Sequence, residues 1–480
     1  MKGTCVATDV RGQADNMTGV RGGAWPWIAV IVVIGLVIGL QTLFTYFACD
    51  DFYWLNAAKR WTDGDAPLFA PNCANNFRPG THLIVYATYL AFGDRAIGYH
   101  VVSVLLHIIV AVGIFSMVSR FVEDRRPAML ASVFFVTASG PMESFQWVSG
   151  MPMLVVGIMF VVAMISADKY AANGSPLFLG FASTASLAAL FTHEFAILIP
   201  VVSSLYAFVS GRVSGSRIRS IVLCNVAILA VWFMAYHNHY AGRSQSIGEV
   251  GEPRLISLSS IPSNMRVALP SLLMPNVSAP SVQQRLPEGL PWVATVFQVF
   301  WVGALVLVSG FILYGLVNRA WQSRLGALWC AAGLCIASIA ASGIAGRYLY
   351  LAIMGFVLVL ATTYAALLQC GQRKWARFFL AVCSLLIAVN MACTQVTLSF
   401  LGVSAQGRIR LLTQIRQIAA RHPEVTDFAV VDLPDKYSRG ISWGAGYYGV
   451  KVTTSVPESA NTRTMVLVYR DGDLVMGNSR

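Results

Sequence analysis

Charged side chains are scarce in this sequence. Only 12% of its 480 residues are Asp, Glu, Lys or Arg, whereas soluble domains average about 25%. This scarcity excludes an ordinary soluble globular protein. The sequence also has no glycine-rich nucleotide-binding loop, no zinc-ligand spacing and no internal repeat. It therefore carries no sign of a nucleotide-binding domain, a structural zinc site or a repeat protein.

Hydrophobic residues make up 56% of the chain, and its mean hydropathy is +0.63. They gather in runs of about 20 residues, the length at which a helix spans a bilayer. The sequence predicts an all-α polytopic membrane protein with about eleven transmembrane helices and no cleavable signal peptide. The expected spans are 25–48, 97–119, 127–145, 150–167, 176–193, 195–211, 220–239, 291–316, 325–344, 347–369 and 377–400.

The loop charges set the expected orientation, because Lys and Arg are retained on the cytoplasmic side. With eleven spans, the inner segments hold fifteen Lys and Arg residues and the longer outer segments hold nine. A twelfth apolar stretch, residues 77–93, has Arg78 and His82 near its start and is expected to be an interfacial amphipathic helix. Basic inner loops beside anionic lipids explain the net charge of +12, so we expect no nucleic-acid partner.

Three parts of the chain follow from this topology. Residues 1–24 form a cytoplasmic N-terminal segment, residues 25–403 a transmembrane domain, and residues 404–480 a periplasmic tail. The transmembrane domain has a first outer loop at residues 49–96 and a second, proline-rich one at residues 240–290, where we expect interfacial helices such as 256–273.

The tail has the pattern of a small α/β unit. An amphipathic helix is predicted at residues 408–421, and strands are predicted at 428–432 and 465–469. Cys49 and Cys73 both fall in the first outer loop, where an oxidising periplasm permits a disulfide. Whether they form one is left open.

An acidic pair, Asp50 and Asp51, stands at the end of the first span. Carboxylates near hydrocarbon are costly unless they are paired, so they are candidates for function. Two adjacent acids also repel each other, and one of them can then hold its proton near neutral pH and act as a base. The alternative is a polar stop where lipid gives way to water.

Other charged residues are expected at the outer ends of spans, on the same face as the acidic pair. Each has a simpler explanation: an interfacial anchor for Arg347, or a solvated turn for Glu194. Their convergence on one face favours a site. The set comprises Arg78, Glu143, His193, Glu194 and Arg347. His100 and His107 lie on one face of the second span and are expected to make helix-packing hydrogen bonds.

The order of these residues resembles the GT-C superfamily of integral-membrane glycosyltransferases, which use polyprenyl-phosphate sugars. The likeness covers residues 25–210 and, briefly, the tenth span. Ser103 stands where Asn is expected, and His193 stands where Lys is commoner. The stretches that carry the likeness are Asp50-Asp51, Phe77-Arg78-Pro79-Gly80, Tyr99-His100 with Leu106-His107, Pro141-Met142-Glu143, His193-Glu194 and Arg347-Tyr348-Leu349-Tyr350.

The resemblance implies a transferase that moves a sugar from a polyprenyl-phosphate donor to a glycan, lipid or protein acceptor of the cell envelope, with inversion. It implies an aspartate as general base, with Asp51 favoured and Asp50 close behind. Arg347 and Arg78 would bind the donor phosphate. Acceptor or sugar hydroxyls would be oriented by Glu143, His193 and Glu194.

The resemblance also sets expectations about partners and place. The lipid-linked sugar is a substrate, so we expect no cofactor; a divalent metal is compatible with the carboxylates but is not predicted. We expect a monomer in the bilayer of a bacterial inner membrane, with its catalytic face toward the periplasm.

Two other classes compete with this hypothesis. A lipid or glycan transporter would favour internal repeats and charges deep in the bundle, neither of which the sequence shows. An O-antigen ligase or polymerase would rely on arginines in a large outer loop. The second outer loop supplies Arg243, Arg254, Arg266 and Arg285.

Overall fold

The computed structural model describes residues 23–48, 50–69, 77–211, 213–241, 261–273, 291–317, 321–340, 346–433, 441, 444–454, 464–470 and 473–476. Cys49 and Cys73, and with them the question of their disulfide, lie outside the described residues. So do residues 1–22 and all of the second outer loop between 242 and 260 and between 274 and 290.

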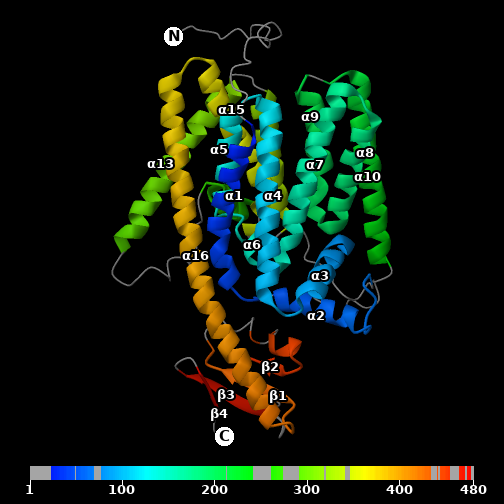
Figure 1. Ribbon diagram of the computed structural model, residues 1–480, viewed down its shortest axis with the longest axis vertical. Helices are drawn as coiled ribbons and strands as arrows, with labels where there is room; N and C mark the ends of the chain where they lie inside the picture. The colour runs from blue at the N-terminus through cyan, green and yellow to red at the C-terminus, as the bar shows by residue number, and fades with distance from the viewer. Residues whose placement is uncertain are drawn as a thin grey trace.

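Long apolar helices lie side by side and form a bundle (Figure 1). Each of the eleven expected spans overlaps one of them. They are α1 (Trp25–Gly39, continued by η3, Leu40–Phe44), α4 (Ala96–Val122), α5 (Arg125–Thr137), α7 (Met151–Asn173), α8 (Pro176–Thr192), α9 (Leu198–Val209), α10 (Gly215–Ala241), α13 (Pro291–Val317), α14 (Trp321–Ala340), α15 (Tyr350–Gln369) and α16 (Arg373–Arg421).

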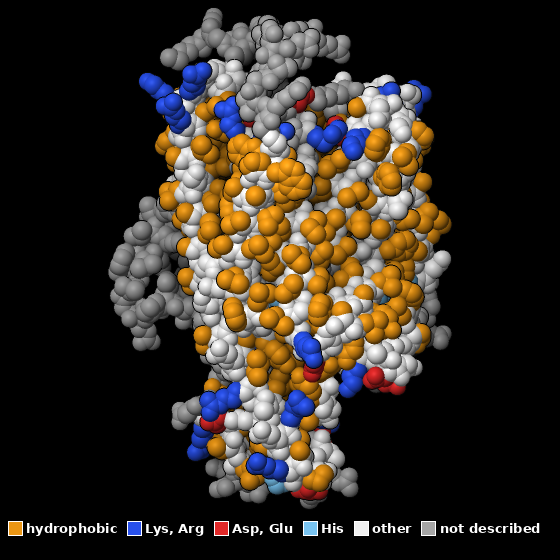
Figure 2. Space-filling model, viewed as in Figure 1, with side chains coloured by type: hydrophobic (Ala, Val, Ile, Leu, Met, Phe, Trp, Pro, Cys, Tyr) orange, Lys and Arg blue, Asp and Glu red, His pale blue; other side chains and the backbone are white. Residues whose placement is uncertain are grey.

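Among the described residues, six helical segments are long and apolar enough to cross a membrane. They are Trp25–Phe44, Ala96–Val122, Val148–Asn173, Gly215–His239, Arg347–Gln369 and Arg373–Arg421. A polytopic, mainly helical membrane protein is thereby confirmed, and the count of eleven spans stays a prediction. Figure 2 shows hydrophobic side chains over the visible side of the bundle and Lys and Arg gathered toward its ends.

Helix α5 is shorter than the expected span at residues 127–145. It ends at Thr137, and Ala138 turns to an extended conformation with ψ of 121°. The next residues, Ser139 to Pro141, are poor helix formers. At Gly140 a Cβ atom would lie 2.2 Å from the carbonyl oxygen of Ser271, so the chain passes too close to its neighbour for any side chain there. A separate short helix, α6 (Glu143–Gln146), follows the break.

Two helices, α2 (Asp50–Thr62) and α3 (Pro79–Phe92), lie across one end of the bundle (Figure 1). Helix α3 is the helix expected at residues 77–93. Its Thr81 hydroxyl donates to the carbonyl oxygen of Thr192, which fixes the start of α3 against the end of α8. The two crossing helices thus bring their first turns to the ends of the long helices.

Helix α15 is the centre of the bundle, since 94% of the residues in its most apolar stretch are buried. Its Tyr350 hydroxyl lies 2.9 Å from Nδ1 of His107, whose Nε2 lies 3.3 Å from the carbonyl oxygen of Val136. His100 Nε2 lies 3.1 Å from the hydroxyl of Thr45. Both histidines therefore make the helix-packing hydrogen bonds that the sequence predicts.

The C-terminal residues form a small α/β cap beyond the bundle end that carries α2 and α3 (Figure 1). The described strands are β1 (Asp427–Val431), β2 (Lys451–Thr453), β3 (Thr464–Arg470) and β4 (Asp473–Met476), in the order β2-β1-β3-β4. Strand β1 is parallel to β2 and β3, and β4 is antiparallel to β3. The predicted small α/β tail is present among these residues.

The cap is tied to the bundle by one continuous helix. Helix α16 runs for 49 residues and crosses the expected boundary at residue 404 without a break, so the helix predicted at 408–421 is its final part. Its Leu411 and Ile415 pack in one buried cluster with Phe52 of α2. The hydroxyl groups of Tyr46 and Tyr448 lie 3.0 Å apart. The cap therefore rests directly on the helix that begins with the acidic pair.

Helix α11 (Ile261–Ser271) is the described part of the second outer loop. It was expected to lie in the membrane interface. In the structure it packs against α14, and the buried Asn264 donates to the carbonyl oxygen of Ser338 at 2.8 Å. A buried amide needs such a partner, so α11 is anchored to the bundle.

Candidate active site

Asp51 lies in the first turn of α2 and is fully buried. Its Oδ2 accepts a hydrogen bond from the backbone N–H of Ala48 at 3.0 Å, and its Oδ1 accepts from that of Ser149 at 2.8 Å. Burial raises the pKa of Asp51 to about 6, against the opposing effect of these two hydrogen bonds. Both carboxylate oxygens are thus engaged in joining the start of α2 to the segment before α7.

Asp50 differs from its neighbour because its side chain is 39% exposed. Its Oδ2 lies 3.3 Å from Nη2 of Arg347, a residue 297 positions further along the chain. The bond is longer than the usual 2.7–2.9 Å of a charge-assisted contact, so the pair is loose. Asp50 is therefore the aspartate of the pair that a solvent-borne group can reach.

Arg347 enters the site from η7 (Gly346–Leu349), immediately before the central helix α15. Its backbone N–H donates to Oε2 of Glu143 at 3.4 Å. Its guanidinium lies 5.4 Å from the ring centres of both Trp147 and Tyr348, within cation–π range. Among the residues that the structure describes, no acceptor lies within hydrogen-bonding distance of its buried Nη1.

Arg78 has a different environment, although it is a cation at the same end of the bundle. Its Nε donates to Oε2 of Glu194 at 2.8 Å, and its Nη2 contacts Oε1 of the same carboxylate. This is a bidentate ion pair between the N-terminus of α3 and η5 (Glu194–Ile197). The Arg78 charge is thus already matched by the protein itself.

His193 lies beside this pair but is not part of it. Its Nδ1 accepts the backbone N–H of Phe195 at 3.3 Å, which requires the unprotonated nitrogen. The contact of 3.6 Å between Nδ1 and Glu194 is therefore not an ion pair. The Phe195 ring lies 4.9 Å from that of Tyr348, so this cluster adjoins the one around Arg347.

The site residues predicted from the sequence thus gather at one end of the bundle, in two clusters. The first contains Asp50, Arg347 and Glu143, with Asp51 buried behind them. The second contains Arg78, Glu194 and His193. Among the described residues, no group of three or more His, Cys, Asp and Glu side chains is arranged to hold a metal ion.

Sequence analysis missed Asn390, which is 1% exposed in the middle of α16. Its Oδ1 accepts from the backbone N–H of Ser139 at 3.0 Å and from its hydroxyl at 2.6 Å. Its Nδ2 donates to the carbonyl oxygens of Leu273 and Leu386. The amide thus holds the segment that leads into Glu143. An Asn within an apolar span was the available signal, because amides there are commonly helix-joining groups.

Comparison with known proteins places this arrangement in a known architecture. No family model matches the chain, and no curated protein matches it in sequence. Among solved structures, ArnT from Cupriavidus metallidurans in the apo state matches with a TM-score of 0.55 at 14% identity, over 91% of this chain and 87% of that one. The chain has the GT-C fold.

Two further structures match less closely. ArnT from the same organism bound to undecaprenyl phosphate gives a TM-score of 0.48 at 15% identity, over 91% of this chain and 87% of that one. The archaeal oligosaccharyltransferase AglB from Archaeoglobus fulgidus, in complex with an inhibitory peptide and a dolichol-phosphate, gives 0.47 at 13%, over 87% and 63%. The match to apo ArnT, at a TM-score of 0.55, confirms at the level of the fold the GT-C resemblance noted from the residues.

Proposed function

We propose that this protein is a membrane glycosyltransferase that moves a sugar from a polyprenyl-phosphate donor to an envelope acceptor at the end of the bundle that carries the two clusters. One observation carries the proposal: Asp50 and Arg347 come from distant segments and place a reachable carboxylate 3.3 Å from a cation with an unused donor. A base and an anion-binding group side by side are what group transfer from a phosphate requires.

Asp50 takes the proton in this proposal. The acceptor hydroxyl attacks the anomeric carbon of the donor and forms the new C–O bond, while its proton passes to the Asp50 carboxylate. The bond between the anomeric carbon and the phosphate oxygen breaks, and the leaving polyprenyl phosphate takes the electron pair. Attack from the face opposite the phosphate inverts the anomeric centre.

Asp51 is better suited to positioning than to proton transfer. The sequence favoured it as the base, but it is fully buried and both its oxygens accept backbone N–H groups. An acceptor hydroxyl would have to displace one of these bonds to reach it. We therefore assign Asp51 the role of fixing the first turn of α2, from which Asp50 projects.

Arg347 binds the phosphate of the donor. Its side chain is 17% exposed, so its charge acts in a partly dry site where electrostatic stabilisation of a leaving group is stronger than in water. Glu143 holds the backbone of Arg347 in place. Arg78, Glu194 and His193 form the neighbouring wall. The sequence favoured phosphate binding for Arg78 and hydroxyl orientation for Glu194 and His193, but Arg78 and Glu194 already satisfy each other, so we assign this wall a structural role.

The shared fold supports the donor class. ArnT, whose apo form this chain resembles at a TM-score of 0.55, has also been solved with undecaprenyl phosphate. We extend that lipid class to this protein, together with an eleven-span topology, a bacterial inner membrane and a periplasmic site. No cofactor and no metal are required for the displacement as written.

A membrane preparation with a radiolabelled polyprenyl-phosphate sugar tests the proposal. We expect label to pass to an envelope fraction, and the double variant Asp50→Asn/Asp51→Asn to abolish transfer. Arg266→Ala, in the second outer loop, serves as the matched control and should leave transfer intact. If Arg266→Ala abolishes transfer and the double variant does not, a ligase-type mechanism replaces this one.

A further inference from the structure

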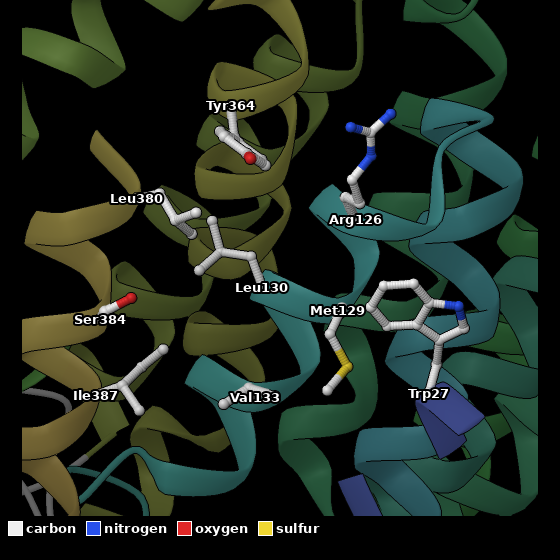
Figure 3. A pocket seen from close by; sticks show the side chains of 9 residues that line it. All are labelled: Trp27, Arg126, Met129, Leu130, Val133, Tyr364, Leu380, Ser384 and Ile387. Carbon is white, nitrogen blue, oxygen red and sulfur yellow. The ribbon is translucent and has the colours of Figure 1, made fainter. Parts of the chain in front are cut away.

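A groove lies between α1, α5, α15 and α16 (Figure 3). These parts of the helices lie near the end of the bundle opposite the cap (Figure 1). Its volume is about 300 Å³. Leu130 and Val133 of α5 form its floor, and Trp27 and Ile387 stand on its two sides. Leu380 of α16 is 36% exposed, so this wall reaches the protein surface. The groove is mainly apolar and opens at the protein surface.

Arg126 of α5 also lines this groove, at its mouth (Figure 3). Its side chain is 66% exposed, and its Nε lies 3.6 Å from Asp124, which is longer than a hydrogen bond. Asp124 instead accepts the backbone N–H of Arg126 at 2.9 Å and caps α5. The Arg126 guanidinium is therefore available to an external anion.

The charge around the mouth is predominantly positive. Leu380 lies about two turns beyond the start of α16, and the exposed side chains of Arg373, Lys374 and Arg377 stand in these turns. On the α5 side, Arg125 adds a further cation, against the acids Glu123 and Asp124. Five cations and two acids make a local excess of three positive charges, counted over these residues of both walls.

We propose that this groove binds an anionic phospholipid, with the phosphate at Arg126 and one acyl chain along Leu130 and Val133. Basic pockets between membrane helices commonly hold anionic headgroups, and an apolar lining suits a hydrocarbon chain. The proposal is independent of the glycosyltransferase function, because it concerns the other end of the bundle.

Distance separates this lipid from the donor. Arg126 and Thr137 are eleven residues apart on α5, a rise of about 17 Å, and the segment with Glu143 begins beyond Thr137. A lipid whose phosphate lies at Arg126 cannot also place that phosphate at Arg347. The occupant is therefore a phospholipid of the leaflet at the basic end.

The test uses the full-length protein, delipidated in neutral detergent, and thermal unfolding with added phosphatidylglycerol or phosphatidylcholine of identical acyl chains. We expect phosphatidylglycerol to raise the Tm more than phosphatidylcholine does. Arg126→Gln should weaken the phosphatidylglycerol effect about fivefold in lipid concentration, the amount expected for one Arg near a lipid phosphate. Arg125→Gln removes the same charge from the same turn but does not line the groove, so it should weaken the effect of phosphatidylglycerol clearly less than Arg126→Gln does.

Three outcomes would overturn the proposal: equal Tm effects of the two lipids, equal losses in the Arg126 and Arg125 variants, or displacement of phosphatidylglycerol by polyprenyl phosphate at equimolar amounts. The last would assign the groove to a donor-type lipid. Val133→Phe fills the groove without changing charge and should weaken the effects of both lipids. Native mass spectrometry of the same four proteins counts the retained lipid and shows whether each variant is folded.

Discussion

The two acid–arginine clusters at the cap end of the bundle differ in how completely the protein satisfies its own charges. Arg78 and Glu194 form a bidentate pair, and the arginine is left with little to offer a ligand. Arg347 and Asp50 touch through one long contact of 3.3 Å, and Arg347 keeps a buried donor without an acceptor among the described residues. The cluster of Arg78 and Glu194 is closed, and the cluster of Asp50 and Arg347 is open.

This difference suggests that one cluster serves catalysis and the other serves stability. A buried donor without a partner costs free energy, on the order of 1–3 kcal/mol. Such a cost is tolerated where a substrate supplies the missing hydrogen-bond partner. The groups of a closed ion pair already have their partners and do not need a substrate. The open cluster should therefore control the rate of transfer, and the closed one should control how the chain is held together.

The largest effect is expected for Asp50→Asn. Loss of a general base typically lowers a rate by about 10²–10⁴-fold, and the amide cannot accept the proton of the acceptor hydroxyl. Initial rates of sugar transfer in proteoliposomes would measure this. Donor binding should survive, because Arg347 remains. If the Asp50→Asn protein transfers sugar at the wild-type rate, another residue is the general base, and Asp51 is the first candidate.

Next comes Arg347→Gln, which removes the cation that faces the leaving phosphate. Removing one donor from such a site costs about 10²–10³-fold in rate. Arg347→Lys keeps the charge but not the planar fork, so it should recover only part of the loss. Gel filtration shows whether the variants are folded. If folded Arg78→Gln lowers kcat as much as folded Arg347→Gln does, the distinction between the open and the closed cluster is wrong.

A smaller effect is expected for Asp51→Asn. The Asn side chain has one acceptor oxygen, so one of the N–H groups of Ala48 and Ser149 would lose its acceptor. This loss would loosen the turn that carries Asp50, and we expect activity at pH 7 to fall about tenfold. A loss as large as that of Asp50→Asn would instead make Asp51 the base.

The pH dependence of stability provides a second measurement on Asp51. Burial raises its pKa to about 6, above an ordinary 3.8, so the folded state holds this proton more tightly than the unfolded state does. Its contribution to the free energy of unfolding is therefore complete below about pH 4 and is lost as the pH rises to about 6, a change of about 3 kcal/mol. Asp51→Asn should remove that part of the pH dependence. Unfolding curves at pH 4 and pH 7 for both proteins give the difference.

The sequence predicts the site only in part, because the residues that contact one another there lie far apart along the chain. Charges at span ends were sufficient to place Asp50, Glu143 and Arg347 on one face, because topology alone decides which ends meet. Which acid each arginine contacts was not predictable, since it depends on packing between helices far apart in the chain. The choice between Asp50 and Asp51 depends on the angle at which α2 begins. The early end of α5 had a local signal in the poor helix formers Ser139 to Pro141, whereas the close passage of Gly140 by Ser271 could not be predicted from any local pattern.

The smallest effect on catalysis is expected for the closed cluster. Glu194→Gln leaves the Arg78 charge without its partner. Because the Glu194 side chain is 39% exposed, solvent limits the expected cost to about 1–2 kcal/mol of stability. Replacing both, as in Arg78→Met/Glu194→Leu, removes the uncompensated charge and should restore much of that loss. The folded double variant should transfer sugar within about fivefold of the wild-type rate, a change of about 1 kcal/mol in the barrier. Rates and unfolding midpoints of Arg78→Met, Glu194→Leu and the double variant form a cycle that measures both properties. If the double variant is stable but inactive, Arg78 binds substrate, and the second cluster is as open during catalysis as the first.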